Sequence, residues 1–220
     1  MKKNILILAG PSAVGKSTVA DGLIAGGRFA LVRSVTTRER RGDVHDGEYF
    51  YVTEEEFSEK LACGAFVEHS LIAGHRYGTP RSELVRIREE GKCPLLILDS
   101  RGVAAFRASE YAADTYAVYL YGDLNVMEER LYARELASSP SVDALLRFTT
   151  RKERNIAEYL AMGERLPLFD LLLPCEDAAT CTVKILSAME RGDTQSETEK
   201  ESLAKEFARA AEEKQNYRTE

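Results

Sequence analysis

The residues whose types and spacing are most specific for chemistry lie near the N-terminus of this 220-residue sequence. Segment 10–17 reads Gly-Pro-Ser-Ala-Val-Gly-Lys-Ser and fits the pattern G-x-x-x-x-G-K-[ST]. It follows an apolar run at 5–9 and precedes a helix predicted over 16–25. Glycines let such a loop turn its N–H groups inward, and the helix N-terminus adds positive potential beneath a polyphosphate. The pattern therefore predicts a nucleotide phosphate site.

The residue types of this loop also suggest how it handles a triphosphate. We expect Lys16 to reach the β and γ phosphates and Ser17 to place its hydroxyl on Mg²⁺. Mg²⁺ is the expected cofactor, with ATP as the phosphoryl donor. The predicted ATP-binding residues are Gly10, Ser12, Ala13, Val14, Gly15, Lys16, Ser17 and Thr18.

Strand and helix patterns alternate along most of the chain and must position this loop. Strands are predicted at 5–9, 31–35, 49–52, 95–98, 116–120 and 170–173. Helices are predicted at 16–25, 54–62, 81–91, 103–111, 124–136, 142–162 and 178–191. The alternation is typical of an α/β protein with a doubly wound parallel sheet, whose ligands bind beyond the carboxyl ends of the strands. The polar stretch after residue 35 interrupts it and is interpreted as an insertion.

The composition excludes several classes of protein. At 44% hydrophobic and 30% charged residues, the chain is an ordinary globular protein, and its longest apolar runs are too short for a bilayer span. A net charge of −6 disfavours sequence-blind nucleic-acid binding. The spacing of the four cysteines matches no zinc or redox pair. We expect a cytoplasmic chain, a monomer or homodimer, that binds neither membranes nor nucleic acid.

A second anion site is suggested by an arginine-rich segment after residue 35. Residues 34–43 read Ser-Val-Thr-Thr-Arg-Glu-Arg-Arg-Gly-Asp, and Tyr49 and the triplet Tyr77-Gly78-Thr79 follow. With Asp99 closing an apolar strand, these segments resemble the guanylate kinase family over about residues 4–190. The resemblance implies a P-loop fold with an inserted small α+β region that binds a nucleoside monophosphate and with a helical lid. It also implies transfer of the ATP γ-phosphoryl group to GMP or dGMP.

The resemblance assigns the acceptor site residue by residue. Arg38, Arg41, Tyr49 and Tyr77 match positions that hold the acceptor phosphate, while Ser34, Glu68, Thr79 and Asp99 match those around guanine. Guanidinium groups bind phosphate bidentately, and a carboxylate can accept from guanine N1–H, which adenine lacks. Either Arg40 or Arg41 fits the second phosphate position, and we favour Arg41. Asp99 could instead help to bind Mg²⁺, with Ser17, or simply cap a helix.

The lid is expected to carry further cations. Arg130 and Arg134 lie four residues apart on one helix, and Arg147 follows a break at 137–140. The resemblance implies that such arginines close over ATP and stabilise charge on the transferring group. Lys16, Arg41, Arg130, Arg134 and Arg147 are therefore the predicted catalytic residues.

These predictions imply a domain layout and leave alternatives. A guanylate-kinase-like domain would span 1–192, with its core at 1–35 and 80–192, the insertion at 36–79 and the lid at 135–150. An acidic amphipathic helical extension would span 193–220, where Leu203 and Phe207 could dock on the core or on a second subunit. Another acceptor, such as another monophosphate or a ribosyl bisphosphate, another donor, and a non-catalytic interaction module remain alternatives.

Overall fold

The computed structural model of the protein describes residues 3–40, 47, 49–72, 74–137 and 140–216. Two compact units divide the chain. Unit 1 comprises Met1–Leu8 and Ala20–Tyr116, and unit 2 comprises Ala9–Val19 and Ala117–Glu220. No helix among the described residues combines the length and apolar character that a bilayer span requires.

Unit 1 contains a parallel sheet built from apolar strands. Its strands are β1 (Ile5–Ala9), β7 (Cys93–Ile97) and β2 (Phe29–Leu31). The strand β7 lies between the other two, with Leu6 opposite Leu95 and Phe29 opposite Cys93. Every residue of β1 is fully buried, as expected for a strand whose sequence is continuously apolar rather than alternating.

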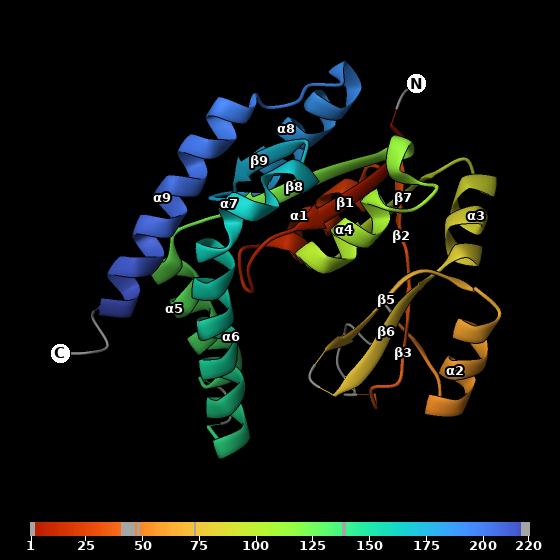
Figure 1. Cartoon of the computed structure of the whole chain (residues 1–220), viewed down its shortest axis with the longest axis horizontal. Helices are drawn as coiled ribbons and strands as arrows, with labels where there is room; N and C mark the ends of the chain where they lie inside the picture. The colour runs from red at the N-terminus through yellow and green to blue at the C-terminus, as the bar shows by residue number, and fades with distance from the viewer. Residues whose placement is uncertain (1–2, 41–46, 48, 73, 138–139, 217–220) are drawn as a thin grey trace. The chain divides into compact units, whose positions relative to one another are not determined.

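A second sheet of unit 1 has the order β4-β3-β6-β5 in the described residues. Its strands are β3 (Ser34–Thr36), β4 (Tyr49–Tyr51), β5 (Phe66–Ile72) and β6 (His75–Pro80). Helix α2 (Glu54–Ala62) lies against this sheet (Figure 1). Its Phe57 packs against Phe66 and Val35 of the sheet, with the Phe57 and Phe66 rings stacked at 4.7 Å. A capping box between Thr53 and Glu56 begins the helix.

The helices of unit 1 follow local signals. Helix α1 (Lys16–Ala25) begins in unit 2 and continues into unit 1, while α3 (Arg81–Glu89), α4 (Ser100–Arg107) and the short η2 (Ala112–Asp114) lie wholly within it. Asp99 caps α4, because its Oδ1 accepts from the Gly102 N–H at 3.0 Å.

Unit 2 repeats the strand–helix plan. Strand β8 (Thr115–Tyr121) begins in unit 1 and continues into unit 2. The other elements of unit 2 are α5 (Leu124–Glu135), α6 (Val142–Leu160), α7 (Met162–Arg165), η3 (Leu166–Leu168), β9 (Leu171–Pro174), α8 (Ala178–Arg191) and α9 (Glu197–Asn216). Strands β8 and β9 pair in parallel, with Tyr119 opposite Leu172. The predicted α/β class with parallel strands is thus confirmed.

In unit 1, one predicted strand was wrong in detail, and one hairpin was not predicted. The strand predicted at 31–35 is two strands, because β2 pairs with β7 in one sheet and β3 pairs with β4 and β6 in the other. The chain changes sheets at residues 32–33. The hairpin of β5 and β6 was not predicted, because Phe66–Pro80 mixes polar and apolar residues without a clean alternation.

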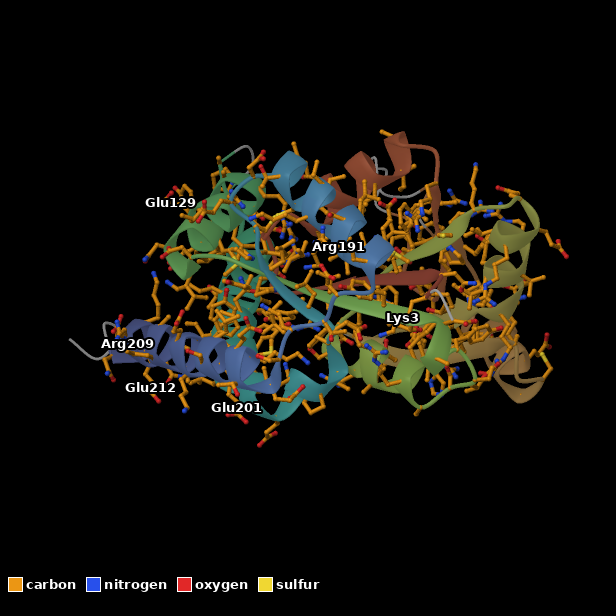
Figure 2. All side chains as sticks on the ribbon, turned by 90° about the horizontal axis from the view of Figure 1, so that it is seen from above. Lys3, Glu129, Arg191, Glu201, Arg209 and Glu212 are labelled. Atoms are coloured by element: carbon orange, nitrogen blue, oxygen red, sulfur yellow. The ribbon has the colours of Figure 1, made fainter. Side chains whose placement is uncertain are left out.

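The C-terminal helix α9 packs within unit 2, along α6 and α7 (Figure 1). Phe207 is 5% exposed, and its ring stacks on Tyr159 with centroids 4.7 Å apart and lies 4.9 Å from Tyr121. The Nζ of Lys214 donates to Oε2 of Glu128 on α5 at 2.8 Å. Charged residues labelled on the outer side of the same helix, such as Glu201, Arg209 and Glu212, point away from the protein (Figure 2).

We predict that Phe207→Ala destabilises unit 2 strongly. Removing a buried phenylalanine costs about 3–5 kcal/mol, because apolar contacts are lost and a cavity remains. Urea unfolding followed by circular dichroism measures the change in the free energy of unfolding. The matched control is Arg209→Ala on the same helix, whose side chain is 83% exposed and should change stability by less than about 0.5 kcal/mol. Equal midpoints for both variants would show that the Phe207 packing does not stabilise the fold.

Candidate functional site

The loop between β1 and α1 has a backbone that only certain residues permit. Gly10 has φ of 141°, and a Cβ there would lie 2.2 Å from the Leu120 carbonyl oxygen. Gly15 has φ of 118°, and a Cβ would lie 3.1 Å from Cys175 Sγ. Ala13 has φ of 65°, the only positive value at a non-glycine among the described residues. The two glycines of the sequence pattern are therefore needed for backbone conformation and for close packing.

Lys16 folds back onto this loop. Its Nζ donates to the carbonyl oxygens of Gly10 at 2.7 Å and of Pro11 at 2.8 Å. The pKa of Lys16 is lowered to about 8, mainly by burial and also by the positive charges of three arginines, while the negative charge of Glu158 opposes this shift. These arginines are Arg134, Arg154 and Arg151. The lysine ammonium thus lies in a field of like charges that an anion would relieve.

Helices α5 and α6 support the loop from within unit 2. Asn155 on α6 is 3% exposed, and its side-chain amide binds both sides of Ser12, accepting from its N–H at 2.8 Å and donating to its carbonyl at 3.0 Å. Arg130 on α5 donates from Nη1 to the carbonyl oxygens of Ala13 and Val14, both at 3.4 Å. These contacts fix the loop to α6 and bring a predicted catalytic arginine to it.

The remaining predicted lid arginines meet at a carboxylate. Arg134 Nε lies 3.0 Å from Glu135 Oε1, and Arg147 Nε lies 3.0 Å from Glu135 Oε2. Arg151 Nε lies 3.6 Å from Oε1 of the same residue. Burial alone would raise the pKa of Glu135, but the hydrogen bond from Arg147 and the charges of Arg151 and Arg134 hold it below its usual value.

In unit 1, a buried carboxylate lies between two neighbouring strands. Glu68 on β5 is opposite Thr79 on β6 and is 7% exposed. The Thr79 hydroxyl donates to Glu68 Oε1 at 2.6 Å. Burial raises the pKa of Glu68, the hydrogen bond from Thr79 opposes the shift, and the charge of Asp99 adds to it. The negative charge of Glu68 is unfavourable in this buried position. Binding of a ligand whose N–H groups donate to the carboxylate would stabilise that charge.

A cluster of arginine and tyrosine lies on the same sheet. Arg38 is 8% exposed, and its Nη2 donates to the Tyr51 hydroxyl at 3.1 Å. Its guanidinium lies 5.4 Å from the Tyr49 ring centroid, and the rings of Tyr49 and Tyr77 meet edge to face at 6.1 Å. Arg40 stacks over Tyr51 at 4.6 Å. Three residues predicted to hold one phosphate, Arg38, Tyr49 and Tyr77, are thus brought together.

The structure places the other predicted residues as follows. Ser17 and Thr18 are exposed in the first turn of α1, and Ser34 on β3 is opposite Tyr49. Asp99 caps α4 and also acts on Glu68. Arg41 lies outside the described residues, so the choice between Arg40 and Arg41 stays a prediction.

Several functional candidates were absent from the sequence prediction. Asn155, Glu135, Tyr51, Arg151 and Arg154 join the clusters only through tertiary contacts. Arg151 and Arg154 could have been suspected from the sequence, because Arg151 follows Arg147 by four residues and Arg154 follows Arg151 by three on the long predicted helix. Nothing in the local sequence marks Asn155.

The two units hold groups of opposite chemical character. Unit 2 offers a glycine-containing loop at the N-terminus of α1, an ammonium and guanidinium groups, which suit a polyphosphate. Unit 1 offers buried carboxylates for N–H donors and a guanidinium among tyrosines for a phosphate. The described residues contain no group of three or more His, Cys, Asp or Glu side chains able to hold a metal ion. Ser17 is the exposed hydroxyl of the loop that could bind a cation carried by a polyphosphate.

Comparison with known proteins identifies the family. The guanylate kinase family model matches residues 2–173. The guanylate kinase of Thermosynechococcus vestitus is 31% identical over 187 residues, covering 84% of this chain and 92% of that protein. The guanylate kinase of Symbiobacterium thermophilum is 34% identical over 143 residues, covering 63% of this chain and 66% of that protein.

A solved structure shares the fold. The guanylate kinase of Anaplasma phagocytophilum superposes with a TM-score of 0.61 at 22% identity, covering 87% of each chain. The chain therefore shares the fold of that protein. With the family match over residues 2–173, these likenesses show that the chain belongs to the guanylate kinase family, whose role is the phosphorylation of GMP.

Proposed function

We propose that this chain transfers the γ-phosphoryl group of ATP to GMP, and to dGMP, giving ADP and the nucleoside diphosphate. The observation that carries the proposal is a pair of separate clusters of cationic side chains in one chain. One is Lys16 on its loop in unit 2, and the other is the Arg38 cluster in unit 1, the unit that also holds the buried Glu68. A phosphotransferase with a nucleotide acceptor needs both kinds of site.

The donor site would act mainly by positioning and by electrostatics. Gly10, Ser12, Ala13, Val14 and Gly15 would turn their backbone toward the phosphates, and Thr18 would extend the first turn of α1. Lys16 would leave the carbonyl oxygens of Gly10 and Pro11 for the β and γ phosphates. Arg130, Arg134 and Arg147 would stabilise negative charge on the transferring group, with Arg151 and Arg154 adding to the field at Lys16.

The acceptor site would combine charge with directed hydrogen bonds. Arg38, with Arg41 or Arg40, would bind the GMP phosphate, and Tyr49 and Tyr77 would orient it. Glu68 would accept from the guanine N1–H and exocyclic amine, while Ser34, Thr79 and Asp99 would line the base. Ser100 lies next to Asp99 with a buried Oγ that has no hydrogen-bond partner in the described chain, which leaves a polar atom for the ligand.

The described residues fit a Mg²⁺ ion that arrives with the nucleotide. Mg²⁺ usually keeps several waters and binds through phosphates and few protein groups, so a dedicated carboxylate cluster is not required. Ser17 would offer its exposed hydroxyl, and the assignment of Asp99 as an acidic metal ligand stays a prediction from the sequence. The ion would offset phosphate charge during transfer.

The proposed layout divides these tasks along the chain. The acceptor site would belong to an inserted region at about 36–79. The lid would comprise about residues 135–150, from the end of α5 to the first part of α6. The core would span 1–35 and 80–192. The extension at 193–220 contains α9, whose packing against α6 supports the side of the donor loop.

A coupled assay for ADP formation across nucleoside monophosphates tests the proposed activity. We expect GMP and dGMP to give the highest kcat/KM in the presence of Mg²⁺, with AMP, UMP and CMP at least about a hundredfold lower, because only guanine supplies N1–H to Glu68. Higher activity with another monophosphate, or with a ribosyl bisphosphate, would move the acceptor assignment. No activity with any acceptor, despite binding of MgATP in calorimetry, would support a non-catalytic module.

We predict that MgATP binding weakens as the pH rises from 7 to 9. The pKa of Lys16 is about 8 in the free protein, and a bound polyphosphate favours the charged amine, so binding raises this pKa and takes up a proton. Affinity should then fall about tenfold between pH 7 and pH 9. Titration calorimetry at pH 8, in buffers of different ionisation enthalpy, should detect proton uptake. The Lys16→Gln variant should lack both effects, and a pH-independent affinity in the wild type would be inconsistent with Lys16 contacting the phosphates.

We predict that Glu68→Gln reduces the preference for GMP. An amide cannot accept from both guanine N–H groups as a carboxylate does, so kcat/KM for GMP should fall by about a hundredfold or more. The KM for ATP should change by less than about threefold. Steady-state kinetics with both substrates measures the two effects. Glu59→Gln, an exposed carboxylate on α2, is the control and should match the wild type. Unaltered GMP selectivity would remove Glu68 from the base pocket.

A further inference from the structure

Glu135 is the covered carboxylate of the α5–α6 pair. Its side chain is 9% exposed, whereas the Arg134 and Arg147 side chains around it are each 48% exposed. Arg151, at 30% exposed, approaches the same carboxylate from the next turn of α6. The acid therefore lies beneath the arginines, and the arginines face the solvent.

The geometry of the contacts indicates which part of each arginine is held. Arg134 and Arg147 both donate to Glu135 through Nε, at 3.0 Å. A guanidinium has one Nε–H and four Nη–H donors, and its outer Nη edge can bind a phosphate bidentately. Holding the Nε side fixes the plane of the group and leaves the Nη donors of Arg134 and Arg147 outside these two contacts.

The charges in this cluster remain favourable for an anion. One carboxylate faces three guanidinium groups, so the cluster keeps an excess of positive charge. Two of its arginines, Arg134 and Arg151, also act on Lys16. The Glu135 cluster and the phosphate loop therefore share one positive field within unit 2.

We propose that Glu135 is a positioning residue that holds Arg134 and Arg147 by their Nε atoms, so that their Nη donors are oriented for the phosphates of the bound nucleotide. The inference rests on the proposed phosphotransferase function. It differs from a place-holder role, in which the nucleotide would displace the carboxylate from the arginines. In the positioning role, Glu135 keeps its contacts when the nucleotide binds.

The test compares Glu135→Gln with the wild type, and Glu129→Gln, an exposed residue on the same helix (Figure 2), serves as the matched control. We expect kcat to fall about tenfold or more in Glu135→Gln, because the arginines lose their fixed orientation in the transition state. The Kd for MgATP and the KM for GMP should each change by less than about threefold. An unchanged kcat, or a Kd for MgATP that falls more than tenfold, would overturn the positioning role.

A double-mutant cycle tests whether Glu135 acts through its partner. In an Arg147→Ala background, Glu135→Gln should cause a much smaller additional loss of kcat than it does alone. If the fold-loss of kcat in the double variant equals the product of the two single losses, Glu135 acts independently of Arg147, and the proposal is wrong. If Glu135→Gln fails to fold, Glu135→Asp gives the same comparison with the charge retained, and kcat should then fall less than in a folded Arg147→Ala variant.

Nitrogen-15 NMR of the arginine Nε–H groups gives a readout that does not require activity. Wild-type protein should show slowly exchanging Nε–H signals for Arg134 and Arg147, assigned with the Arg134→Lys and Arg147→Lys variants. We expect these signals to persist with Mg²⁺ and adenylyl imidodiphosphate, and to be lost in Glu135→Gln. Their loss on adding the analogue would contradict the proposal. An inactive wild type with these NMR results would refute the proposed function and leave the Glu135 contact standing.

Discussion

The donor site depends on a lysine ammonium held among like charges. Arg134, Arg151 and Arg154 act on Lys16 with like charges, and the carbonyl oxygens of Gly10 and Pro11 accept hydrogen bonds from its Nζ. Such a concentration of positive charge destabilises the free protein and is relieved by a polyanion. The loop can hold the ammonium in this way only because Gly10 and Gly15 permit its backbone conformation.

Helix α6 makes this arrangement possible within unit 2. Asn155 binds the backbone of Ser12, and one turn later the Tyr159 hydroxyl accepts from the Gly122 N–H at 2.9 Å, while Phe207 of α9 stacks on the Tyr159 ring. The basic side chains of the same helix, including Arg151 and Arg154, act on Lys16. A single helix therefore combines the apolar packing that fixes its place with the charges that the site needs. The C-terminal helix contributes by completing that packing.

Unit 1 contains a buried negative charge, in contrast to the positive charge of Lys16 in unit 2. Glu68 is buried, which raises its pKa, and the charge of Asp99 raises it further, while Thr79 supplies the hydrogen bond that keeps the carboxylate oriented. N–H donors would stabilise the negative charge of Glu68, just as phosphate would stabilise the positive charge of Lys16. Base selectivity and phosphate binding would thus follow from the same principle. In each site the substrate would stabilise a charged group that the protein alone stabilises only in part.

The sequence predicts those features of the structure that depend on a pattern of only a few neighbouring residues. The Gly10–Ser17 loop, the Thr53 capping box and helix α8 follow from local patterns, and the structure agrees with them. The β5–β6 hairpin and the change of sheet at 32–33 depend on pairing between distant strands, which local periodicity does not reveal. Asn155 and Glu135 look like ordinary polar residues of helices until the fold brings Ser12 and three arginines to them.

The chain carries a net charge of −6, yet both proposed ligands are anions. The two facts are compatible because charges separated by more than about 8 Å of solvent are largely screened at physiological ionic strength. A nucleotide at the loop responds to Lys16 and the nearby arginines, whereas Glu201 and Glu212 on the outer side of α9 mainly affect solubility (Figure 2). A net negative charge is therefore compatible with the binding of a small phosphorylated ligand where cationic side chains are concentrated.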